Sequence, residues 1–154
     1  FQKTKALGMP FTIHAGECGS AQNIADAVKA GAGRIGHGIA MRGHPGLQKL
    51  IRQEGIGIEM CPISNLQTKA VSCPEEYPLR EVLKAGLSVS INTDNRTVSN
   101  TSMTKELEFI QNTYGMKDVD LIRLMKNAAD TAFASDDIKQ KLYRKITEFE
   151  QNNR

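Results

Sequence analysis

The sequence has little that would suit a protein that binds nucleic acids or membranes. It contains no Trp, five Phe and three Tyr, so few aromatic rings are present to stack on bases. The 20 Lys and Arg residues are interleaved with 17 Asp and Glu residues, which leaves a formal net charge of only +3 over 154 residues. The longest apolar runs are as long as strands, far short of the roughly 20 residues that a membrane-spanning helix needs. Composition therefore gives neither class any support.

The chain is also poor in cysteine. Cys18, Cys61 and Cys73 form no CxxC pair, and no signal-peptide pattern opens the sequence. These features favour a soluble protein of a reducing compartment, and we expect the cytoplasm. The first residue is Phe1, and residues 1–9 look like the last turns of a helix that Gly8 ends. We therefore expect a fragment of a longer chain.

What is present is a regular alternation of strand and helix patterns within one domain. Short β-type runs occur at 10–16, 33–38, 55–62 and 87–94. A helical pattern follows each of them, at 20–31, 43–55, 77–86 and 102–115. The first three patterns end at a glycine, as helices commonly do: Gly31, Gly55 and Gly86. Two amphipathic helices follow at 119–133 and 137–151.

This alternation predicts an α/β fold of parallel strands, either a layered sheet or a barrel. Ligand sites in such folds form at the carboxyl ends of the strands. Polar side chains able to do chemistry follow all four predicted strands: His14 and Glu17, then His37, then Ser64 and Asn65, then Asp94 and Asn95. The third histidine, His44, lies in a turn before a helix, and we expect it to be solvated and to have no role.

Metal-assisted hydrolysis is the chemistry that these residues could support. Zinc takes imidazole nitrogen and carboxylate oxygen as ligands, and His14 and Asp94 could supply two of them. Structural roles stay open beside this interpretation. His14 could be a buried, hydrogen-bonded histidine, Glu17 and Asp94 could cap helices, and His37 could fill a tight turn. Ser64 and Asn65 could cap the next segment or line the pocket. Next to these residues, we expect Cys18 and Cys61 only to pack.

Four motifs together resemble the C-terminal half of adenosine deaminases. They are HAGE at 14–17, GHG at 36–38, CPISN at 61–65 and SINTDN at 90–95. The resemblance covers essentially the whole of residues 1–154. It implies the second half of a zinc-dependent (β/α)₈ barrel, four parallel βα units followed by C-terminal helices. The implied reaction converts adenosine, and in some enzymes 2′-deoxyadenosine, to inosine and ammonia.

The same resemblance implies a role for individual residues. His14 and Asp94 correspond to zinc ligands, and Glu17 corresponds to the acid that protonates purine N1. His37 corresponds to the residue that orients and deprotonates the attacking water. Asn95 stands where the family often has an Asp that contacts purine N7, and an amide can donate to that acceptor. We place Gly16 with Asn95 as substrate-binding.

The resemblance also leaves a part of the site unaccounted for. The family's other two zinc ligands form an HxH pair, and this sequence contains none. A (β/α)₈ barrel needs about 250 residues. We therefore expect the missing half-barrel, or a second copy of the chain, as a partner, and expect the fragment alone to be inactive. Deamination of adenine or an adenine nucleotide remains the alternative among enzymes, and a non-catalytic half-barrel that only associates with a partner remains the alternative outside them.

Overall fold

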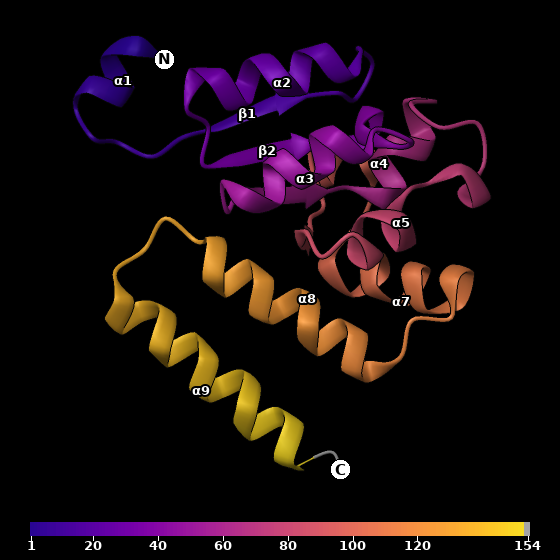
Figure 1. The fold of residues 1–154 in the computed structure, drawn as a ribbon. Coiled ribbons are helices and arrows are strands. Elements are labelled where there is room, and N and C mark those ends of the chain that lie inside the picture. Colours follow the sequence, from indigo (N-terminus) through magenta and orange to yellow (C-terminus); the bar gives the residue numbers. More distant parts are fainter. Residues whose placement is uncertain (153–154) are drawn as a thin grey trace.

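Four short strands form one parallel sheet, in the order in which they occur along the chain (Figure 1). The computed structural model describes residues 1–152. All four strands fall inside the predicted ranges: β1 (Thr12–Ala15), β2 (Arg34–His37), β3 (Gly57–Met60) and β4 (Ser88–Ile91). Each neighbouring pair is parallel. The predicted α/β architecture of sequential βα units is therefore confirmed.

The structure also has a helix in each region where the sequence predicts one: α1 (Gln2–Ala6), α2 (Ala21–Ala30), α3 (Pro45–Gln53), α5 (Leu79–Lys84), α7 (Met103–Tyr114), α8 (Asp118–Thr131) and α9 (Asp136–Asn152). The predicted stops at Gly31, Gly55 and Gly86 take positive φ angles of 91°, 65° and 78°. Two short helices were not predicted, α4 (Pro62–Gln67) and α6 (Arg96–Ser99). The 3₁₀ turns η1 (Ile39–Met41) and η2 (Pro74–Glu76) were not predicted either.

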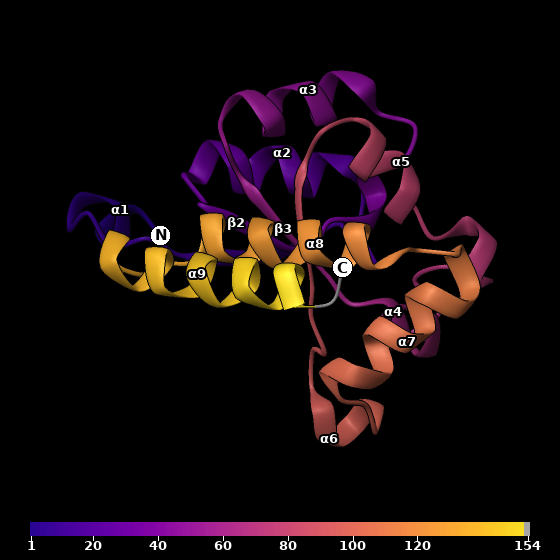
Figure 2. The same cartoon turned by 90° about the horizontal axis from the view of Figure 1, so that it is seen from below.

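The register of the sheet separates apolar from polar side chains. Because successive side chains of a strand point to opposite faces, residues that pair across parallel strands share one face. One such row is apolar throughout: Ile13, Ile35, Ile58 and Val89. It joins a core to which α2, α3 and α5 contribute Ile24, Ile51 and Val82, and Figure 2 shows these helices together on one side of the strands. The next row is mostly polar: His14, Gly36, Glu59 and Ser90.

The last two helices, α8 and α9, lie on the β4 side of the sheet. Helix α8 lies along β4, where Asn127 Nδ2 donates to the Val89 carbonyl at 3.0 Å, and α9 packs on α8. Helices α6 and α7 follow β4 and both pack against α4. Figure 2 shows α6 and α7 on the side of the strands away from α2 and α3. Among the helices described in residues 1–152, none has both the length and the apolar character that crossing a bilayer requires. Because all four strands are parallel, their carboxyl ends lie at the same edge of the sheet.

Candidate active site

The four side chains that the sequence singled out for chemistry gather at the carboxyl edge of the sheet. His14 lies within β1 and His37 ends β2, and their rings meet edge to face with centroids 4.8 Å apart. Glu17 follows β1, and its Oε2 lies 3.4 Å from His37 Nε2. Asp94 comes three residues after β4 ends at Ile91, whereas the predicted strand extended to residue 94 itself. Ligand atoms of Glu17, His37 and Asp94 all lie within 4.8 Å of one another.

This grouping differs from the pair of metal ligands that the sequence suggested. Within residues 1–152, the cluster of mutually close ligand atoms consists of Glu17, His37 and Asp94, and His14 stands outside it. His14 and Asp94 nevertheless line the same cavity of about 280 Å³, together with His37, Glu59 and Cys61. The structure therefore brings His14, His37 and Asp94 to one cavity, with Glu17 beside His37 and Asp94, but it leaves His14 outside the tightest cluster.

Two of these residues have strained backbones. His37 and Asp94 have φ angles of 67° and 53°, in the left-handed region that side chains other than glycine rarely adopt. Each such residue costs on the order of 1–3 kcal/mol and persists only where its surroundings hold it. At Asp94, one such contact is visible, because Ser64 Oγ donates to Asp94 Oδ2 at 2.7 Å. Strain of this kind at strand ends fits residues that are held in place for function.

The structure decides several of the structural alternatives. Ser20 is the N-cap of α2, in a capping box with Asn23, and Asn95 is the N-cap of α6. Glu17 and Asp94 are therefore not the caps of these helices. Ser64 and Asn65 lie inside α4, are buried, and contact the site residues.

The two residues predicted to bind substrate have clear local roles. Gly16 has a φ of +69°, and a Cβ there would lie 2.5 Å from Ile24 Cδ1, so only glycine fits without displacing the core. Asn95 Oδ1 accepts hydrogen bonds from the Thr97 and Val98 backbone N–H groups at 3.2 and 3.1 Å. The carbonyl end of the Asn95 amide is thus engaged in the cap, and its NH₂ group is the end that can donate to a ligand.

The donors at this edge fit a divalent metal ion bound through nitrogen and oxygen. Imidazole nitrogen and carboxylate oxygen are the available groups. Cys61 also lines the cavity, but burial, and next the nearby Asp94 carboxylate, raises the pKa of its thiol to about 12. Because the thiolate is the form that binds metals, Cys61 is a poor ligand as it stands and packs as expected.

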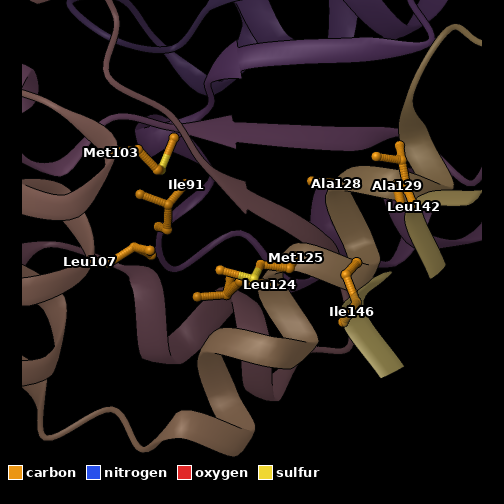
Figure 3. Close-up of a pocket in the computed structure, with 9 residues that line it drawn as sticks. All are labelled: Ile91, Met103, Leu107, Leu124, Met125, Ala128, Ala129, Leu142 and Ile146. Carbon is orange, nitrogen blue, oxygen red and sulfur yellow. The ribbon is translucent and has the colours of Figure 1, made fainter. Parts of the chain in front are cut away.

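A second cavity nearby is apolar (Figure 3). It measures about 330 Å³ and lies between β4, α7, α8 and α9, with a lining of Ile91, Met103, Leu107, Leu124, Met125, Ala128, Ala129, Leu142 and Ile146. None of these side chains can transfer a proton or bind a hard metal ion, so this cavity offers no group for the hydrolysis that the sequence predicts. Met103 lines both cavities.

Sequence comparison agrees with the motifs found at this edge. A sequence model of the adenosine deaminase family matches residues 1–149. The chain belongs to the adenosine deaminase family. It is 48% identical to adenosine deaminase from Enterococcus faecalis over 140 residues, which are 91% of this chain and 42% of that protein. It is 46% identical to adenosine deaminase from Shewanella halifaxensis, over 90% of this chain and 42% of that protein.

Solved structures of deaminases have the same fold. An adenine deaminase from Arthrobacter aurescens superposes with a TM-score of 0.92 at 28% identity, covering 97% of this chain and 46% of that one. An amidohydrolase from Burkholderia ambifaria with bound Zn superposes with a TM-score of 0.83 at 25% identity, covering 96% and 43%. The chain thus spans less than half the length of these adenosine deaminase relatives. The predicted fold class, half of a (β/α)₈ barrel, is confirmed.

Proposed function

We propose that residues 1–154 are the second half of a zinc-dependent adenosine deaminase, whose complete barrel hydrolyses adenosine to inosine and ammonia and also accepts 2′-deoxyadenosine. The observation that carries the proposal is the gathering of four side chains at the carboxyl edge: His14, His37 and Asp94 line one cavity, and Glu17 lies beside His37 and Asp94. The identity of 44–48% to curated adenosine deaminases supports the choice of reaction.

In this proposal, Asp94 and His14 would hold the metal ion at the strand ends. A bound zinc ion lowers the pKa of a water molecule to roughly 7 and so provides a nucleophile at neutral pH. A catalytic zinc site normally has at least three protein ligands, and the remaining ones would come from the other half of the barrel. The likeness to an amidohydrolase with bound Zn supports the choice of zinc.

The protein groups would act on the purine as follows. Glu17 would carry a proton on Oε2 and deliver it to N1 while water adds to C6, which keeps negative charge off the ring. His37, 3.4 Å from the same oxygen, would orient the attacking water. The Asn95 NH₂ group would donate to N7, and Gly16 would let the substrate approach the backbone closely.

Adenine is the alternative substrate that a specific observation favours, because an adenine deaminase superposes with a TM-score of 0.92. The groups that would select a ribose lie outside residues 1–154 in our proposal. The test is to supply the purified full-length protein with adenosine, 2′-deoxyadenosine, adenine and AMP and to measure the deaminated products and the zinc content. Preference for adenine would transfer the proposal to that substrate. A protein that deaminates none of them would refute the proposal, and one that also holds no zinc would favour a non-catalytic half-barrel.

A further inference from the structure

Asn65 is a fully buried amide that touches two of the proposed catalytic groups at once. Its Nδ2 lies 3.1 Å from Glu17 Oε1 and 2.9 Å from His37 Nδ1. Its Oδ1 lies 3.3 Å from the Tyr77 hydroxyl. The Asn65 side chain is fully buried and comes from α4. Glu17 follows β1, and His37 is the last residue of β2. One side chain therefore links three separate segments of the chain.

The partners decide which end of the amide faces which group. A carboxyl oxygen without a proton can only accept hydrogen bonds, and the proposed function places the proton of Glu17 on Oε2. Glu17 Oε1 is therefore an acceptor, and it also faces the Thr68 hydroxyl at 3.2 Å. The amide NH₂ must therefore face Glu17, which directs its second N–H to His37 Nδ1. Tyr77 completes the arrangement, because burial raises the pKa of its phenol well above the ordinary value and keeps the hydroxyl able to donate to Asn65 Oδ1.

We infer that Asn65 is a positioning residue, which holds the Glu17 carboxylate and the His37 imidazole in a fixed relation and selects the tautomer of His37. An amide NH₂ offers only hydrogens, so His37 Nδ1 must accept, and the proton of the neutral ring lies on Nε2. Nε2 is the nitrogen that faces Glu17 Oε2. This inference rests on the proposed function for its catalytic meaning.

The selected tautomer changes what His37 can do. With its proton on Nε2, the neutral ring donates a hydrogen bond toward the cavity and orients water through that N–H group. The family resemblance implies that His37 removes a proton from water. With Nδ1 facing Asn65, that proton would have to go to Nε2, which needs the opposite tautomer, with the proton on Nδ1. Asn65 disfavours that tautomer, because it would set two N–H groups against each other at 2.9 Å.

The tautomer can be read directly by ¹⁵N NMR of the full-length protein labelled at histidine, with the His37 signals assigned by their loss in His37→Gln. In the wild type at neutral pH, we expect His37 Nδ1 to be unprotonated and Nε2 to carry the proton. In Asn65→Asp a carboxylate faces Nδ1, and we expect the proton to move to Nδ1. A wild-type ring protonated on Nδ1 would overturn the inference without any variant being made.

Kinetics of the same protein supply the second readout. Loss of groups that orient active-site ligands typically costs 10–100-fold in activity, so Asn65→Ala should lower kcat by about that factor and leave the zinc content unchanged. Tyr77→Phe should shift the His37 signals and kcat in the same direction, to a smaller extent. The matched control is Gln48→Ala, which removes another buried amide that bonds Met41 and Glu81 away from the site. It should lower stability but keep kcat and the His37 signals.

The two readouts separate this inference from the proposed function. If the wild type deaminates adenosine while Asn65→Ala keeps kcat within about twofold and the His37 signals do not move, Asn65 has no positioning role and the proposed function stands. If the wild type deaminates no adenine compound, the proposed function fails, and the NMR signals still decide whether Asn65 selects the tautomer.

Discussion

Gly36 offers the sharpest test of the metal assignment, because the three atoms nearest to a Cβ at this position all belong to His14. Gly36 is paired with His14 across β1 and β2, and the imidazole ring lies against it. A Cβ at Gly36 would lie 2.8 Å from His14 Cδ2, whereas ordinary contact begins at 3.4 Å. The backbone of Gly36 is not in the left-handed region, so alanine is tolerated there apart from this contact. In Gly36→Ala, the ring must therefore withdraw by about 0.6 Å, the difference between these two distances.

A shift of this size matters for a metal ligand. Ligand distances in metal sites hold to about 0.2 Å, so His14 could no longer bind with good geometry. We expect the zinc affinity of Gly36→Ala to fall roughly 10–100-fold, which corresponds to about 1.4–2.8 kcal/mol. The free energy of unfolding of the metal-free protein should change by less than about 1 kcal/mol, because alanine suits a strand no worse than glycine does.

The assay is a competitive zinc titration of the metal-free full-length protein, with thermal unfolding measured in parallel. Gly46→Ala is the matched control, since a Cβ at Gly46 would meet nothing within 4 Å. The double variant Gly36→Ala/His14→Ala should bind zinc as His14→Ala does, because Gly36 acts through His14. Wild-type zinc affinity in Gly36→Ala would show that the ring either moves freely or does not bind the metal.

Three further predictions follow from the site and its surroundings. In the full-length protein, Glu17→Gln should keep zinc but lower inosine formation by a factor on the order of 10². Asp94→Ala should lose both zinc and inosine formation. Near-normal turnover in Glu17→Gln would contradict the role of Glu17 as the acid. Residues 1–154 alone should bind zinc weakly and form no inosine, so a zinc-loaded, active monomer would show that the chain holds a complete site. Burial raises the pKa of Glu106, which has no exposed surface, above its ordinary value of 4.5. A raised folded-state pKa means that the stability from this carboxyl is present at low pH and is lost as pH rises through that pKa. The stability of the wild type relative to Glu106→Gln, from urea unfolding, should therefore fall as pH rises, and a difference that is flat with pH would be inconsistent with it.

The strands, the long helices and the location of the site could be predicted from the sequence. Period-2 and period-3.6 patterns are local properties, and each of these elements is long enough to show its own. The rule that parallel strands end at one edge then placed His14, Glu17, His37 and Asp94 together, although up to 80 positions separate them. The four motifs added the family.

Short elements could not be predicted in the same way. Helices α4 and α6 have six and four residues, and no glycine follows either of them to mark a helix end in the sequence. The strand pattern at 55–62 includes Pro62, but Pro62 begins α4, because a helix tolerates proline in its first turn. Tertiary packing of α4 against α7 holds this helix in place.

The arrangement of side chains at the site came only from the tertiary structure. Sequence reasoning left open whether Asn65 caps a helix or lines the pocket, and nothing local indicates that its amide meets Glu17, 48 positions away. Likewise, only the register of β1 and β2 shows that Gly36 lies against His14. Only the folded structure shows that Asp94 lies close to Glu17 and His37, while His14 lies outside that cluster. Whether two side chains form a hydrogen bond or bind one metal ion depends on differences of tenths of an ångström in the distance between segments that are far apart in the sequence. The sequence determined which residues reach the edge of the sheet, and packing decided which of them touch.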